Sequence, residues 1–244
     1  MNIKEQLDKV WAKDYINQLP DFVKERGFVY SINNSEKDIL VTGINPSFRQ
    51  DADDLNSYGF DFQKTLKETK WNNYWGPLKR ILIDADNNID LKDRTAYLDI
   101  FYFREKEQKK LRNGILKKSN GVEFLVDQLV ITQHSIEEII KPKVIVVKNK
   151  ESAAYWGKLS EQGFIWMGYQ FEYLQSFNCG KLYKISGLID STERIAPDID
   201  KTNLKGSLIL FSEHISQYTK KEKRPTAVLI NDFLEKYYKL KKED

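Results

Sequence analysis

The chain has 244 residues, of which 41% are hydrophobic and 31% charged, and it carries a formal net charge of +3. A chain of this length and composition buries a substantial core, and its small net charge neither requires nor opposes a polyanionic partner. The single cysteine, Cys179, excludes both a disulfide framework within the chain and a four-cysteine zinc or iron–sulfur site. We expect no iron–sulfur cluster, no other metal and no organic cofactor.

The sequence contains no apolar run that approaches the roughly 20 residues needed for a membrane-spanning helix. The first residues also lack the apolar region of a signal peptide. These features predict a cytoplasmic protein, and we expect a monomer that has no membrane partner.

The predicted elements begin with residues 1–37, which are expected to be helical and to pack on a single domain spanning residues 1–244. Short apolar runs then alternate with helix-like segments. The apolar runs, each predicted to be a strand, lie at 39–42, 96–100, 144–147 and 208–211. The helix-like segments lie after Pro77, from Asn120 to about residue 140, and at 227–238.

Other local signals refine this order of elements. At the start of the central helix, Asn120 and Glu123 have the spacing of a capping box. An extra strand is predicted at 181–185, whereas the polar stretch 190–205 is expected to be a loop. The last residues, 239–244, are expected to fray.

The apolar runs are continuous rather than alternating, which is typical of strands that are covered on both faces. Strands that alternate with helices predict a mostly parallel sheet. The predicted fold class is therefore α/β, a three-layer sandwich with a central, mostly parallel sheet.

Ligands of open α/β sheets bind outside the carboxyl ends of the strands. We therefore expect polar residues that follow the predicted strands to converge on one edge of the sheet. Those residues are Asn45, Ser47, Asp99, Arg104, Asn149, Ser212, Glu213 and His214.

The first of these strand ends reads Gly43-Ile44-Asn45-Pro46-Ser47, and the glycine and proline predict a sharp, stiff turn that presents Asn45. A Gly-Phe-Asp-Phe element follows at 59–62 and an Asn-Tyr-Trp-Gly-Pro element at 73–77. This order resembles the uracil-DNA glycosylase superfamily, in particular its mismatch-specific uracil/thymine branch. Residues 142–147 and 212–216 are similar to later elements of that superfamily, so the resemblance extends over most of the chain.

The resemblance implies a monofunctional DNA glycosylase, an N-glycosyl hydrolase of base excision repair that flips uracil or a related damaged base out of DNA. Asn45 would position the attacking water, and His214 would stabilise negative charge on the departing base. Base-binding residues would be Ile44, Ser47, Phe62 and Asp99, with Phe62 stacking on the base. An amide is not a strong general base, so the enzyme would be slower than one with a carboxylate at position 45.

The resemblance also implies contacts with the DNA strand beyond the base. Tyr218 stands where the family places a wedge that fills the gap left by the flipped nucleotide. Ser216 precedes it, and Lys220 and Lys221 follow it, with Lys223 and Arg224 close behind; these basic residues would pair with phosphates.

Some residues depart from the family pattern and leave alternatives open. His214 is not followed by the usual proline, Glu213 adds a negative charge, and 190–205 has no counterpart in the family. The chain could therefore be a catalytically silent member of the same fold that binds nucleic acid or a nucleobase. An enzyme acting on a small phosphorylated or nucleotide metabolite is a third hypothesis, but the sequence contains no glycine-rich phosphate loop, which argues against it.

Individual residues also have ordinary structural interpretations. Asn45 could bond its own turn, and Phe62 could be a core aromatic residue. His214 could be an exposed loop histidine, and Asp99 could be a buried carboxylate with a purely structural partner. His134, on the central helix, is interpreted as structural.

Overall fold

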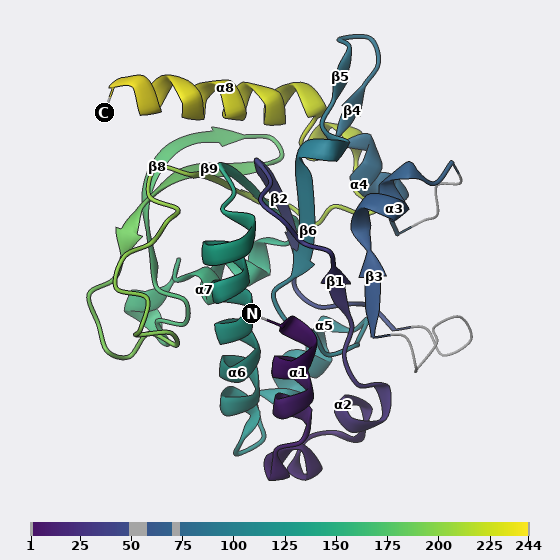
Figure 1. The fold of residues 1–244 in the computed structure, drawn as a ribbon, viewed down its shortest axis with the longest axis vertical. Coiled ribbons are helices and arrows are strands. Elements are labelled where there is room, and N and C mark those ends of the chain that lie inside the picture. The colour runs from purple at the N-terminus through teal and green to yellow at the C-terminus, as the bar shows by residue number, and fades with distance from the viewer. Residues whose placement is uncertain (1, 49–57, 70–73, 244) are drawn as a thin grey trace.

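The computed structural model describes residues 2–48, 58–69 and 74–243, and in those residues the main sheet contains six strands (Figure 1). Their order is β6 (Thr95–Asp99), β2 (Ile39–Gly43), β7 (Val144–Val147), β10 (Leu208–Ser212), β9 (Gly180–Leu188) and β8 (Tyr169–Phe177). The strands from β6 to β10 are parallel, and β9 and β8 add an antiparallel hairpin at one edge. The prediction of an α/β fold with a mostly parallel sheet is confirmed.

The parallel strands are buried along their whole length, as their continuous apolar sequences predict. Successive side chains of a strand point to opposite faces, so Leu40 and Ile145 join one apolar cluster while Val41 and Val146 join another. Each face of the sheet therefore has its own core, which helices cover.

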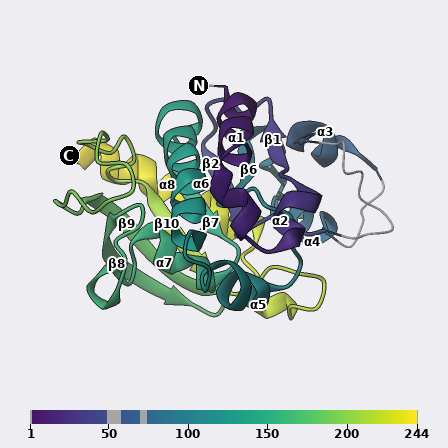
Figure 2. The same cartoon turned by 90° about the horizontal axis from the view of Figure 1, so that it is seen from below.

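One face of the sheet packs against α1 (Ile3–Trp11), α6 (Gly121–His134) and α7 (Ala153–Trp156). Figure 2 shows α1 lying beside α6. The opposite face packs against α3 (Phe62–Lys67), α4 (Gly76–Arg80) and α8 (Ala227–Glu243). The helix–sheet–helix layering agrees with the predicted three-layer architecture.

Shorter elements complete the described fold. A parallel pair joins β1 (Tyr30–Ile32) to β3 (Gly59–Asp61), and an antiparallel pair joins β4 (Ile83–Asp84) to β5 (Ile89–Asp90). Helical segments outside the main layers include α2 (Asp21–Arg26) and α5 (Gln108–Lys110). Short 3-10 or π-helical segments lie at Asp14–Gln18, Lys92–Arg94, Leu111–Ile115, Lys150–Ser152, Ser160–Gln162 and Lys221–Lys223. Within the described ranges, no helix is both long and apolar enough to cross a membrane.

The N-terminal segment is helical only in part. Helix α2 ends at Gly27, whose φ of +59° turns the backbone in a conformation that favours glycine. Residues Tyr30–Ile32 then form β1, because β3 offers them a partner strand. The prediction of helix was therefore wrong for these residues.

The capping box predicted for α6 is absent. Asn120 does stand at the N-cap, but its side-chain amide donates a hydrogen bond to Gln18 at 2.7 Å and makes no capping bond. The packing of the N-terminal segment against α6 thus replaces a local interaction with a long-range one. At the other end of the chain α8 continues through Glu243, into the stretch for which fraying is predicted, and Asp244 lies outside the described residues.

The segment 190–205 is a loop without helix or strand, as predicted, and it is fixed to the protein by a buried carboxylate. Glu137 accepts hydrogen bonds from Thr202 Oγ1 at 2.6 Å and from the Asn203 backbone N–H at 2.7 Å. The same carboxylate accepts a bond from the Tyr169 hydroxyl at 2.8 Å. The loop is therefore a packed part of the fold.

Candidate functional site

The strand order of the sheet places a ligand-binding position at the end of β2. From β2 the chain crosses to β6 on one side and later returns to β7 on the other. The carboxyl ends of β2 and β7 therefore flank the point where the order reverses, and ligands of α/β proteins bind at such a point. Gly43 ends β2, Asp99 ends β6 beside it, and Lys148 follows β7.

A strongly perturbed group at this edge is the carboxyl of Asp99, which is only 6% exposed. Burial raises the pKa of Asp99 to about 6. The positive charge of Lys148 and a 2.8 Å hydrogen bond from the Tyr97 hydroxyl act in the opposite direction and stabilise the carboxylate. Asp99 is therefore ionised at neutral pH although its ionisation is disfavoured.

Lys148 supplies the positive charge of the site. Its ammonium lies 4.7 Å from the ring centre of Tyr74 and 5.0 Å from that of Tyr97. The two hydroxyls of these tyrosines are 3.3 Å apart. Aromatic faces attract cations, so the rings hold the ammonium near Asp99 in a partly dehydrated environment.

Gly43 is needed for the close approach of these side chains. A Cβ atom added to it would stand 1.9 Å from Asp99 Oδ1, 2.8 Å from the Tyr97 hydroxyl and 2.9 Å from Lys148 Cε. The glycine of the first motif thus makes room for the charged cluster at the neighbouring strand ends.

We expect Gly43→Ala to destabilise the protein by about 1–3 kcal/mol, because the added methyl group must displace a buried carboxylate. Urea unfolding measures the change. Gly163→Ala is the matched control, since a Cβ at Gly163 would meet no atom within 4 Å. Equal stability of the two variants would contradict the close packing of Asp99 against Gly43.

Asn45 is buried, and its amide is directed towards the protein backbone. Nδ2 donates to the backbone carbonyls of Pro46, at 3.0 Å, and of Phe103 and Glu105. Oδ1 accepts a bond from Gln108 Nε2 at 3.2 Å. Asn45 therefore ties the turn after β2 to the segment that follows β6.

The neighbours of Asn45 in the first motif continue this connection between the two segments. The Ile44 carbonyl accepts a hydrogen bond from the Phe101 N–H at 2.9 Å, and the Pro46 carbonyl accepts one from the Glu105 N–H at 2.9 Å. The Ile44 side chain is buried, and Ser47 is partly exposed. Of the predicted base-binding residues in this turn, Ser47 thus has the more accessible side chain.

Phe62 lies on the same side of the sheet as Asp99 but is only 2% exposed. Its ring centre is 5.3 Å from that of Tyr97 and 5.7 Å from that of Trp75. In this conformation it packs against Tyr97 and Trp75 and leaves little surface for stacking on a base. The Asn73 position of the corresponding motif lies outside the described residues.

His214 follows β10, and its loop is bonded to the residue that follows β7. The N–H of Ile215 donates to the Lys148 carbonyl at 3.0 Å, which fixes the His214 loop beside that lysine. The imidazole is exposed, yet its partial desolvation lowers its pKa, and the charge of Lys148 lowers it further, with Glu151 acting in the opposite direction. A lowered pKa keeps the imidazole neutral at pH 7, able to donate one N–H.

The loop after His214 presents Tyr218, whose side chain is 86% exposed. Ser216 and Thr219 bond to each other across the loop at 3.1 Å. Arg224 donates to the carbonyls of Gln217, at 3.1 Å, and Thr219, at 2.7 Å. The guanidinium thus holds the loop backbone, and the exposed ammonium groups of Lys220 and Lys221 follow directly in the chain.

No protein-family model matches this chain, and no curated protein matches it. The residues described here contain no group of three or more His, Cys, Asp or Glu side chains placed to hold a metal ion. The His134 imidazole bonds to Glu138 at 3.0 Å and lies 3.3 Å from Asp198. This pairing with two acidic side chains agrees with the structural interpretation of His134.

Several predicted residues do converge, and others do not. Asp99 and His214 both border Lys148, as the strand-end argument predicts. Lys148 and Tyr97 were not predicted as site residues. Lys148 is the first residue after its strand, and Tyr97 stands two residues before Asp99 on the same face, so both positions carried a usable signal. The end of the sheet thus brings a carboxylate and a neutral imidazole each within electrostatic range of the Lys148 ammonium.

Proposed function

We propose that this protein is a DNA glycosylase with a uracil-DNA glycosylase-like fold that hydrolyses the N-glycosidic bond of uracil or a related damaged base. The observation that carries the proposal is the meeting of Asp99, Lys148 and His214 at the carboxyl edge of the sheet, next to the Gly-Ile-Asn-Pro turn. The sequence order of its motifs gives further support.

The groups found in this cluster suit the chemistry of base removal. Cleavage of the bond leaves negative charge on the base and positive charge on the sugar. The neutral imidazole of His214 would donate a hydrogen bond to the departing base, and the ammonium of Lys148 would stabilise the same charge. The carboxylate of Asp99 would stabilise the positive sugar and orient the attacking water, and it would accept the proton that the water loses when its oxygen bonds to the sugar.

This assignment gives Asn45 a different task from the one implied by the family resemblance. Its amide hydrogens are directed to backbone carbonyls, so it would maintain the shape of the turn while Asp99 orients water. The pKa of Asp99, about 6, leaves a carboxylate at neutral pH that is more basic than an ordinary one.

The proposed partner is damaged or uracil-containing DNA, and the exposed loop after His214 supports it. Tyr218 projects from a backbone that Arg224 and Thr219 hold in place. A rigidly presented aromatic side chain can replace the stacking that a flipped nucleotide leaves behind. Ser216 shapes this loop, and Lys220 and Lys221 supply positive charge next to it.

The test is incubation of the purified protein with uracil-containing and mismatch-containing oligonucleotides, followed by detection of abasic product. We expect cleavage, and we expect His214→Ala to slow it by about 100-fold, because one donor to the departing anion is lost. Lys24→Ala, an exposed change on α2, serves as a control that should retain the full rate. A wild-type protein that yields no abasic product on any of these substrates would overturn the proposal.

A catalytically silent nucleic-acid-binding protein is the second candidate function. The commitment of the Asn45 amide to the backbone and the burial of Phe62 favour it, because neither residue is placed for the role that the family resemblance implies. If this candidate is correct, the protein should bind DNA in a salt-dependent way and release no base from it. Failure to bind DNA, RNA or free nucleobases would exclude it.

A further inference from the structure

A groove with a volume of about 500 Å³ opens beside the candidate site, at the end of β10 and the β8–β9 turn. Two of its lining residues are close in the chain to residues of the site, since Glu213 directly precedes His214 and Lys150 lies two residues after Lys148. A chain-like ligand bound at the candidate site could therefore continue into this groove.

The charges in the groove favour an anion. Its described lining includes the basic residues Lys150, Lys158 and Lys181 and the acidic residue Glu213. Lys150 pairs with Glu213 at 3.1 Å. Among the described residues, no carboxylate lies within ion-pair distance of Lys158 or Lys181, so their charges are available to a ligand.

Aromatic side chains accompany these lysines. The Lys158 ammonium lies 4.3 Å from the ring centre of Tyr183, and both residues line the groove. Tyr173 is 55% exposed and packs against one of the lining residues, with its ring centre 5.6 Å from that of Tyr183. Its hydroxyl bonds to Ser176, a lining residue, at 2.9 Å. An exposed aromatic side chain thus lies next to the lysines of the groove.

Aromatic faces together with lysines fit a single strand of nucleic acid. Unpaired bases expose their faces for stacking, and the phosphates between them pair with ammonium groups. In a duplex the base faces are covered by their neighbours, so a protein ring at a groove rim cannot stack on them. A lone phosphate would use the lysines but would have no need of Tyr173.

We propose that this groove binds the single-stranded segment that flanks the nucleotide held at the candidate site. Lys158 and Lys181 pair with phosphates, and Tyr173 stacks on an unpaired base. The inference rests on the proposed function, which places the target nucleotide at the candidate site and the flanking strand in the groove. Single-stranded or locally opened DNA is then the preferred substrate.

The experiment is fluorescence anisotropy with a labelled oligothymidylate of about 15 nucleotides, which contains no uracil. We expect Lys158→Glu combined with Lys181→Glu to weaken binding more than tenfold and to reduce the salt slope by about 1.4, since each phosphate contact on a single strand contributes about 0.7. Tyr173→Ala is expected to weaken binding by at least about fivefold without changing the slope.

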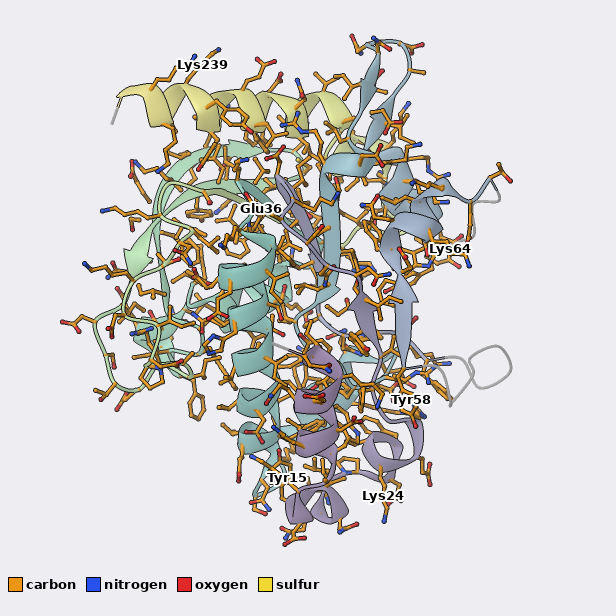
Figure 3. All side chains as sticks on the ribbon, viewed as in Figure 1. Tyr15, Lys24, Glu36, Tyr58, Lys64 and Lys239 are labelled. Carbon is orange, nitrogen blue, oxygen red and sulfur yellow. The ribbon has the colours of Figure 1, made fainter. Side chains whose placement is uncertain are left out.

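The matched control is Lys24→Glu combined with Lys239→Glu (both labelled in Figure 3), which changes the net charge equally at residues that do not line the groove. Thermal melting confirms that each variant is folded. Equal loss of affinity in the groove and control variants would overturn the proposal. Competition by duplex or by thymidine monophosphate at the same concentration as the single strand would also overturn it, in favour of a general electrostatic surface or a mononucleotide site.

The result is independent of catalysis, because the probe carries no scissile base. Absence of cleavage on the uracil-containing panel would overturn the proposed glycosylase while leaving groove binding intact. Cleavage that persists with unchanged affinity in the groove variant would overturn the groove proposal alone.

Discussion

Replacement of Asp99 by asparagine is expected to stabilise the folded protein at pH 7.5 by up to about 3 kcal/mol and to abolish base removal. The expected gain follows from burial, which raises the pKa of Asp99 from about 3.9 in an unfolded chain to about 6. Asparagine fills nearly the same space and can accept the hydrogen bond of Tyr97. It carries no charge, so folding does not have to remove a charged group from water.

The sign of the pH dependence follows from the same shift. Between pH 4 and pH 6 the unfolded chain has released the Asp99 proton while the folded chain retains it. The contribution of this group to the free energy of unfolding therefore decreases as pH rises through that range, and stays low above pH 6. The advantage of the asparagine variant should be small at pH 4 and largest above pH 6.

Urea unfolding of both proteins at pH 4.5, 5.5, 6.5 and 7.5 measures this difference. Tyr97→Phe is the matched companion, because it removes the hydroxyl that stabilises the carboxylate and should move the pH dependence to higher pH. A stability difference that does not vary with pH would contradict the raised pKa of Asp99.

The combination of the two readouts separates function from structure. A purely structural carboxylate would leave a stabilised and still active variant when it is replaced. A carboxylate that orients water is retained in spite of its effect on stability, which is the trade-off often found at active sites. A loss of at least about 100-fold in the cleavage rate, together with a higher stability, would assign Asp99 to the reaction.

The main sheet was largely predictable from the sequence, for a physical reason. The strands β2, β6, β7 and β10 are covered on both faces, so nearly all their residues are apolar and their runs stand out from the chain. β8 lies at the sheet edge and has many exposed polar side chains, so it lacks such a run. β1 is a three-residue strand that depends on a partner far along the chain.

The candidate site was predictable as a set of strand ends but not as a set of contacts. The position of Asp99 beside Gly43 follows from the register of β6 against β2, which no local pattern reveals. The orientation of Asn45 depends on carbonyl groups at Phe103 and Glu105, which lie 58 and 60 residues later in the chain. Long-range partners of this kind determine which polar side chains at an edge remain available to a ligand.

Replacement of Asn45 by aspartate distinguishes two roles of the amide, which are to maintain the turn and to position the attacking water. If Asn45 maintains the turn, aspartate should destabilise the protein by at least about 3 kcal/mol, because a carboxylate oxygen would face the carbonyls of Pro46, Phe103 and Glu105 in place of a donor. If Asn45 instead positions water, aspartate should preserve stability and accelerate base removal, since a carboxylate is the stronger base.

Asn149→Asp is the matched control for this experiment. Asn149 stands after β7 at the same edge of the sheet, and its side-chain oxygen accepts a hydrogen bond from the Glu151 N–H at 2.9 Å. Aspartate can accept the same bond, so this variant should change stability by less than about 0.5 kcal/mol. Thermal and urea unfolding compare the two variants directly. If the Asn45→Asp protein is as stable as the control and removes the base faster than the wild type, then Asn45, and not Asp99, positions the attacking water.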